Sequence, residues 1–132
     1  MTRLGAAWAL ALAPAALAQS PGDLVVNDYN RSRLEVYAPD GTLQSTTAGS
    51  GTGSQWQGAA VTPGGLLATV RRLPSNGIDV FAPDGTEVAT FDTPQVVLPG
   101  DLDVFSDGTF AVCDFSSGEV DLFTAAGVYI GS

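Results

Sequence analysis

The chain has 132 residues with 14 acidic and five basic side chains and no histidine, so its formal net charge is −9. A surface this acidic repels phosphate backbones and anionic lipid head groups, which excludes nucleic acid and anionic membranes as partners. The absence of histidine excludes a Ser-His-Asp triad and a histidine-activated cysteine nucleophile.

The first residues have the pattern of a secretory signal peptide. A positive Arg3 precedes an almost wholly apolar run from Leu4 to Ala13, and Ala16-Leu17-Ala18 has the small-x-small pattern of a cleavage site. We therefore predict a signal peptide over residues 1–18, cleavage near Ala18, and export to the periplasm or the extracellular space. A membrane anchor is the weaker interpretation, because Pro14 interrupts the apolar run and about 20 residues are needed to span a bilayer.

The rest of the chain repeats with a period near 43 residues. The segment 37–42 returns 44 residues later as 81–86, and a looser copy follows after a further 42 residues as 123–128. A repeat of this length, with short apolar runs and regular turn signals, is typical of propeller blades of four strands.

In chain order, the first repeat contains an alternating apolar strand, a turn, a second strand and an Asp-Gly turn at Asp40-Gly41, which predicts two successive hairpins. The second repeat has the same order, with its Asp-Gly turn at Asp84-Gly85, and it adds an innermost strand before the others. The third repeat also has an innermost strand. The predicted strands are 24–28, 34–37 and one from Thr42; 58–62, 67–71, 78–81 and one from Thr86; and 101–105, 110–114, 120–123 and one from Val128.

These eleven strands predict an all-β fold of three antiparallel propeller blades, half of a six-bladed propeller, with a first blade that lacks its innermost strand. The approximate blade bounds are 19–55, 56–97 and 98–132. No helix is expected after the signal segment. Period-2 alternation predicts an inter-blade core of repeated apolar residues: Leu24, Val26, Leu34, Val36, Leu67, Ile78, Val80, Phe110, Val112, Val120 and Leu122.

The third copy resembles an NHL repeat. Its residues 99–114, 120–123 and 127–131 follow the family patterns P-x-G-I-A-V-D, D-G-N-I-Y-V-A-D, R-I-Q-V-F and G-x-F-L-x-x-F-G, and residues 23–37 of the first copy are at least as similar. The middle copy departs from the pattern, because Arg71 stands where the other copies have Asp28 and Asp114. The resemblance implies blades of a six-bladed propeller, but its motifs carry no chemistry.

Three blades cannot close a propeller, since closed rings have about four to eight. Two explanations remain open. The chain is the front part of a longer gene product, which we favour, or two copies associate to complete a ring. Unpaired strand edges promote aggregation, and either explanation would cover the edges of the first and last blades.

The candidate metal ligands are Asp101 and Asp103 on the third innermost strand, which are oxygen donors suited to Ca²⁺. Asn27, Asp28 and Asp114 at strand ends are further candidates. The favoured alternative is structural, because aspartates at such positions commonly cap turns by accepting backbone N–H bonds. Ca²⁺ is thus the single candidate cofactor.

Two aromatic residues are candidates for a binding surface. Tyr29 lies in a predicted hairpin turn, and Trp56 precedes an innermost strand, where packing between blades is the alternative that we favour. The single cysteine, Cys113, has no partner in the chain for a disulfide, and its strand pattern favours a buried structural role, although its redox state stays open.

The sequence predicts no catalytic residue and favours an exported binding or interaction scaffold with an unidentified protein or small-molecule ligand. The first alternative is a fragment of a metal-dependent propeller enzyme of the lactonase or lyase type, which six-bladed relatives imply. The second alternative is a truncated gene product without activity of its own.

Overall fold

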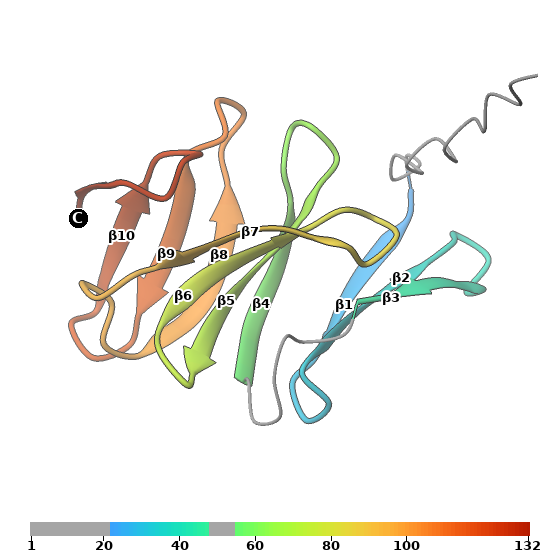
Figure 1. Ribbon diagram of the computed structural model, residues 1–132, viewed down its shortest axis with the longest axis horizontal. Coiled ribbons are helices and arrows are strands. Elements are labelled where there is room, and N and C mark those ends of the chain that lie inside the picture. Colours follow the sequence, from blue (N-terminus) through green and yellow to red (C-terminus); the bar gives the residue numbers. More distant parts are fainter. Residues whose placement is uncertain (1–21, 48–54) are drawn as a thin grey trace, which may run out of the picture.

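A computed structural model of the chain describes residues 22–47 and 55–132, and over these residues it contains eleven β-strands and no helix. The strands form three antiparallel sheets that stand side by side (Figure 1). This confirms the all-β class and the three blades, the first with three strands and the others with four. The predicted signal peptide over residues 1–18 lies outside the described residues. No helix within them is long and apolar enough to cross a membrane.

Within each blade the strands pair in chain order, from the innermost strand outward. Blade 1 comprises β1 to β3, blade 2 comprises β4 to β7, and blade 3 comprises β8 to β11. The strand bounds are β1 Leu24–Asp28, β2 Arg33–Tyr37, β3 Leu43–Thr46, β4 Gln55–Val61, β5 Leu67–Leu73, β6 Gly77–Phe81, β7 Glu87–Asp92, β8 Pro99–Val104, β9 Phe110–Asp114, β10 Glu119–Phe123 and β11 Tyr129–Gly131.

The Asp-Gly turns form as the sequence predicts. In the second blade Gly85 has a φ of 89° and donates its N–H to Ala82 O at 2.9 Å, while Asp84 Oδ1 accepts the N–H of Thr86 at 2.9 Å. Asp40 accepts the N–H of Thr42 at the same distance in blade 1. These carboxylates therefore close turns rather than forming a site.

Strand β4 begins at Gln55, three residues before the predicted start at residue 58, because it continues through an irregularity between Gln57 and Ala60. Gly58 lies in this irregularity with a φ of 62°, and a Cβ at this position would come within 2.8 Å of the backbone nitrogen of Leu102 in β8. Glycine therefore permits both the backbone conformation and the close approach of the two innermost strands.

Each blade has two faces, and cross-strand partners share a face. We call the face turned toward the preceding blade the N-side face and the face turned toward the following blade the C-side face. The C-side face of blade 1 packs on the N-side face of blade 2, through the core residues Leu34, Val36, Trp56, Leu67 and Phe81. The C-side face of blade 2 packs on the N-side face of blade 3, through Ala68, Val70, Ile78, Val80, Val96, Leu102, Phe110, Val112 and Phe123.

Seven of the eleven predicted core residues are buried, and the four others need correction: Leu24, Val26 and Val120 are exposed, and Leu122 is partly exposed. The reason is position in the stack. Leu24 pairs with Tyr37 just as the buried Leu67 pairs with Phe81, so Leu24 and Val26 lie on the N-side face of blade 1, on which no described blade packs, while Val25 packs against the core. Val120 and Leu122 lie on the C-side face of blade 3, on which no described blade packs either.

This assignment predicts the cost of truncating core valines. Val80→Ala and Val112→Ala should each lower the free energy of unfolding by about 1 to 3 kcal/mol, because each removes buried apolar area between blades 2 and 3. Val97→Ala is the matched control, since Val97 is exposed and should change the value by less than about 0.5 kcal/mol. Urea unfolding measures all three, and unchanged midpoints in both core variants would show that the register is wrong.

Candidate functional site

One strand of every blade carries a buried carboxylate, namely β2 in blade 1, β6 in blade 2 and β10 in blade 3. Glu35, Asp79 and Asp121 occupy the same place between two apolar residues, and alternation turns each of them to the N-side face of its blade. The burial of Asp79 and Asp121 follows from the stacking of blades, because blades 1 and 2 cover the faces on which they lie, whereas Glu35 is buried by Arg33 and Tyr37 of its own blade. A buried carboxylate is costly without partners, so each blade must supply them.

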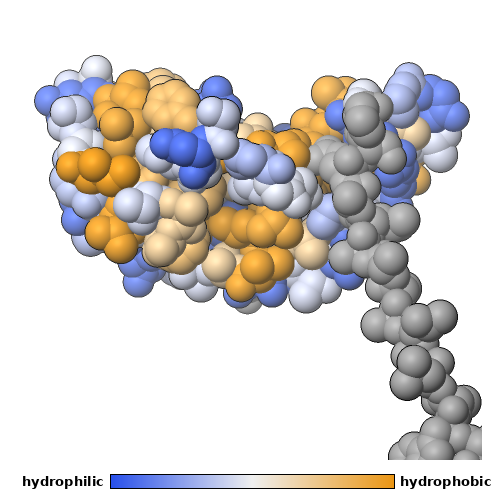
Figure 2. Space-filling model, turned by 90° about the horizontal axis from the view of Figure 1, so that it is seen from above, coloured by the Kyte–Doolittle hydropathy of each residue, from blue (hydrophilic) through white to orange (hydrophobic). Residues whose placement is uncertain are grey.

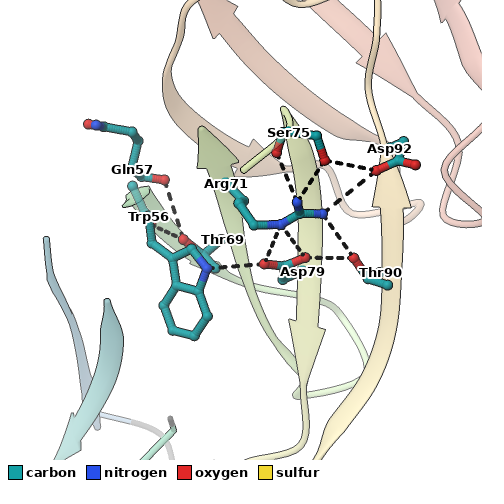
Figure 3. A network of polar contacts seen from close by, with 9 residues as sticks. Trp56, Gln57, Thr69, Arg71, Ser75, Asp79, Thr90 and Asp92 are labelled. Atoms are coloured by element: carbon teal, nitrogen blue, oxygen red, sulfur yellow. Dashed lines mark hydrogen bonds and ion pairs between the residues drawn. The ribbon is translucent and has the colours of Figure 1, made fainter. Parts of the chain in front are cut away.

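In blade 2, Asp79 on β6 receives partners from the three other strands of the blade (Figure 3). Arg71 Nε on β5 lies 3.2 Å from Asp79 Oδ1 and 3.1 Å from Asp79 Oδ2 on β6. Trp56 on β4 donates its Nε1–H to Asp79 Oδ2 at 3.0 Å, and Thr90 on β7 donates its hydroxyl to Asp79 Oδ1 at 2.7 Å. Arg71 NH1 also donates to the carbonyl and the hydroxyl of Ser75, at 2.9 and 3.0 Å. The network ties the blade together across its width.

Trp56 is fully buried in this network, with its ring 5.1 Å from that of Phe81 between centroids. The surface candidate Trp56 is therefore wrong, and the favoured alternative, packing between blades 1 and 2, is confirmed. Its indole has an apolar body and one N–H donor, and here the donor bonds to Asp79 while the body fills the core. Tyr29 is exposed in the turn between β1 and β2, and its surface contact stays a prediction.

Blade 1 surrounds its carboxylates with arginines from its own hairpin. Arg31 NH1 lies 3.0 Å from Asp28 Oδ2, and Arg33 pairs with Glu35 through NH2. Tyr37 donates its hydroxyl to Glu35 Oε2 at 2.6 Å, and this bond to a carboxylate raises the pKa of Tyr37. Asp28 therefore belongs to a surface ion-pair cluster.

Asp114, at the end of β9, fixes the connection between blades 2 and 3. Its carboxylate accepts the N–H groups of Val97 at 2.8 Å, Leu98 at 3.1 Å and Ser116 at 2.8 Å. The bond from Val97 is the main reason that the pKa of Asp114 falls from 3.8 to about 2. Asp114 therefore fixes the segment that connects blades 2 and 3. This is the structural role that the sequence favoured for aspartates at strand ends.

Asp101 and Asp103 are exposed on β8, and each accepts the backbone N–H of the following residue: Leu102 at 2.8 Å and Val104 at 2.7 Å. Over residues 22–47 and 55–132, no three acidic, histidine or cysteine side chains come together in a way that would hold a metal ion. The geometry thus gives the predicted Ca²⁺ site no additional ligand. Cys113 is a free, partly exposed thiol on the C-side face of blade 3.

A groove of about 350 Å³ lies between blades 2 and 3, near the turns at the top of Figure 1. Its floor is apolar, with Phe91 of β7 and Phe110 of β9 in contact at 6.3 Å between ring centroids. Its remaining walls come from the turns 62–66 and 106–108, from Val80, Val88 and Ala89, and from Ala125. Sequence reasoning missed this groove because its residues are spread over 64 positions, from Thr62 to Ala125, and share no motif.

No protein-family model and no curated protein matches the sequence, so the resemblance to NHL repeats stays a prediction. Solved structures do match. Virginiamycin B lyase from Staphylococcus aureus is similar with a TM-score of 0.71 at 16% identity, over 86% of this chain and 38% of that chain. The Cps50 (Swd1) β-propeller domain of Myceliophteria thermophila has a TM-score of 0.64 at 15% identity, over 78% of this chain and 37% of that chain.

A gluconolactonase from Xanthomonas campestris has a TM-score of 0.59 at 23% identity, over 79% of this chain and 35% of that chain. The chain thus spans less than half the length of each of these three solved structures. At these identities the likeness establishes the fold alone: the chain has the fold of a partial β-propeller, consistent with its antiparallel sheets.

The ion pair of Arg71 and Asp79 predicts strongly coupled substitutions. Arg71→Met should destabilise the chain by about 3 to 5 kcal/mol, because it leaves the buried Asp79 carboxylate without its cation. The double variant Arg71→Met/Asp79→Leu should cost clearly less than the two single variants together. A double-mutant cycle in urea measures the coupling, and additive costs would contradict the proposed pairing.

Asp114 predicts a change in the pH dependence of stability. A carboxyl with a lowered pKa in the folded chain stabilises it above the unfolded pKa, and this contribution is lost as the pH falls toward about 2. Asp114→Asn should therefore lower stability at pH 7 by about 1 to 2 kcal/mol and flatten the loss of stability between about pH 5 and pH 2. The other carboxylates are common to both proteins, so equal slopes in urea titrations would rule out this role of Asp114.

Proposed function

We propose that the chain is an exported propeller segment that acts as a binding scaffold and holds an apolar group in the groove between blades 2 and 3. The groove carries this proposal, because a concave and mainly apolar site of about 350 Å³ falls within the usual size range of ligand pockets. Export is supported by the signal-peptide pattern of residues 1–18.

The rim of the groove favours an uncharged or cationic ligand. Asp107 lines the rim, and its bond from the backbone N–H of Thr109 lowers the pKa of this carboxyl. Like exposed aspartates in general, it carries a negative charge at neutral pH. Thr62 uses its hydroxyl oxygen to accept the N–H of Leu66. Since these polar groups already serve their own turns, the affinity would come mainly from apolar contacts, and an aromatic ring fits this chemistry.

The walls of the groove are well supported. Gly127 has a φ of 77°, and a Cβ there would collide with the ring of Phe91, so the turn that precedes β11 packs directly against this wall. Phe110 is buried in the core that joins blades 2 and 3. A ligand in the groove would thus contact side chains that are held in place before it binds, which lowers the cost of binding.

The second candidate function is that of a fragment of a metal-dependent propeller enzyme. Its support is the fold that the chain shares with a lyase and a gluconolactonase. Asp101 and Asp103 remain its candidate ligands, although both already accept adjacent backbone N–H groups. The groove, by comparison, is lined throughout by described residues. For this reason we favour the function of a binding scaffold.

The proposal predicts that a small neutral aromatic compound binds the groove. Indole titrated into the protein should shift the amide NMR signals of the groove residues, and Val88→Asp should weaken binding at least about tenfold, because a charge beside an apolar ligand is desolvated.

Val97→Asp and Leu24→Asp are the controls, since Val97 and Leu24 are both exposed but lie outside the groove. Both controls should bind indole as the unchanged protein does. Shifts that spread over the ends of the blade stack, or equal affinity in all three variants, would show that the groove is not the site.

A further inference from the structure

The charges of the chain are divided between the two ends of its blades. The end that carries the groove, which we call the groove end, has carboxylates at Asp40, Asp84 and Asp107 in its turns and no basic residue in any of them. All four arginines between residues 22 and 132 lie toward the opposite end of the strands. The turns of the groove end are 38–42, 62–66, 82–86, 105–109 and 124–128.

Among the described residues that line the groove, Asp107 is the one with a charged side chain. Its Oδ1 accepts the N–H of Thr109 at 2.9 Å, and no basic side chain of residues 22–47 and 55–132 forms an ion pair with it. The groove therefore combines an apolar floor with one negative charge at its rim that has no cation of its own.

The turn that carries Asp107 is held in one conformation. Phe105 donates its N–H to Thr109 O, and Gly108 donates its N–H to Phe105 O, both at 2.9 Å. A Cβ on Gly108 would lie 3.3 Å from the Cβ of Ala125, so this turn also packs against the next turn of blade 3. Because the carboxylate is already in place, a ligand does not have to order it on binding.

Figure 2 views the molecule from the groove end, and it shows hydrophobic and hydrophilic residues side by side over blades 2 and 3, on the left. The hydrophobic floor contains the rings of Phe91 and Phe110. Aromatic rings attract cations to their faces, and a chain with a net charge of −9 attracts cations and repels anions. The floor, the rim and the overall charge therefore favour the same kind of ligand.

We propose that the groove binds an organic ammonium ion, with an aromatic body on Phe91 and Phe110 and an ammonium group facing the carboxylate of Asp107. The inference rests on the proposed function, since it names the chemical class of ligand for the same groove. Asp107 is exposed, and exposed ion pairs contribute little to affinity. The charge thus selects among ligands whose apolar bodies bind equally well.

The test compares ligands of similar shape and different charge. Phenethylamine, phenethyl alcohol and phenylacetate are respectively a cation, a neutral molecule and an anion at neutral pH. Titrations followed by the amide NMR signals of the groove residues measure the three affinities. The amine should bind about three- to fivefold more tightly than the alcohol, and phenylacetate should bind more weakly than the alcohol. Added salt should reduce the advantage of the amine, because it screens an exposed charge.

Two variants assign this advantage to one carboxylate. Asp107→Asn removes the charge but keeps a side-chain oxygen that can accept the N–H of Thr109, and it should bind the amine and the alcohol with equal affinity. Asp84→Asn is the matched control, because Asp84 accepts the N–H of Thr86 at 2.9 Å in an equivalent turn but does not line the groove. It should keep the advantage of the amine, and circular dichroism checks that both variants fold.

Equal affinity of the unchanged protein for the amine and the alcohol would overturn the inference. An advantage of the amine that persists in Asp107→Asn would also overturn it, as would one that disappears in Asp84→Asn, since the charge of the whole groove end would then be responsible. If indole and the alcohol bind but the amine has no advantage, the proposed function stands and the ammonium preference alone is wrong. If none of these compounds shifts the groove signals, both are wrong.

Discussion

The packing of one sheet face on the next is the interaction on which the rest of this structure depends. A single blade is a thin sheet whose two faces both carry apolar residues, and it can bury them only between neighbours. Blade 2 is the one blade with a described neighbour on each side, and its strand β6 is buried along its whole length. The blades at the ends have one covered face each, which is why strands of the same pattern differ so much in exposure.

Burial on both faces also explains the polar residues of the core. In a sheet with one solvent-exposed face, a carboxylate between two buried apolar residues would point to water. In blade 2 the corresponding carboxylate, Asp79, points to blade 1 instead. Asp79 is therefore compensated by an arginine, an indole and a hydroxyl, each from a different strand. Arg71 interrupts the repeat at a position where the neighbouring copies have aspartate, and the departure from the repeat pattern is thus a local solution to charge burial.

The sequence repeat predicted the turns and strands, which depend on residues close together in the chain. It did not predict the features that depend on contacts between blades. The turns at Asp40-Gly41 and Asp84-Gly85 and the strands between them follow from residues that lie within a few positions of each other. The exposure of Leu24 and Val26 depends on whether another blade packs on the N-side face of blade 1, which alternation within one strand does not define. Trp56 could be read as surface or core, because an aromatic residue before a strand fits both. The groove has residues from two blades and no motif, so no pattern within one repeat could indicate it.

The arrangement of the blades explains why a groove forms between blades 2 and 3, beside the turns 62–66 and 106–108 and strand β7. Innermost strands lie close together, and at this point the interface uses glycine and alanine: a side chain on Gly58 would collide with β8. Farther out, the blades diverge and larger residues fill the gap, with Phe91, Phe110 and Phe123 between blades 2 and 3. Beyond Phe91 the β7 positions that line the gap are Ala89 and the exposed Val88, which are too small to fill it. The groove is therefore the place where the widening space between two blades exceeds the side chains that the repeat provides.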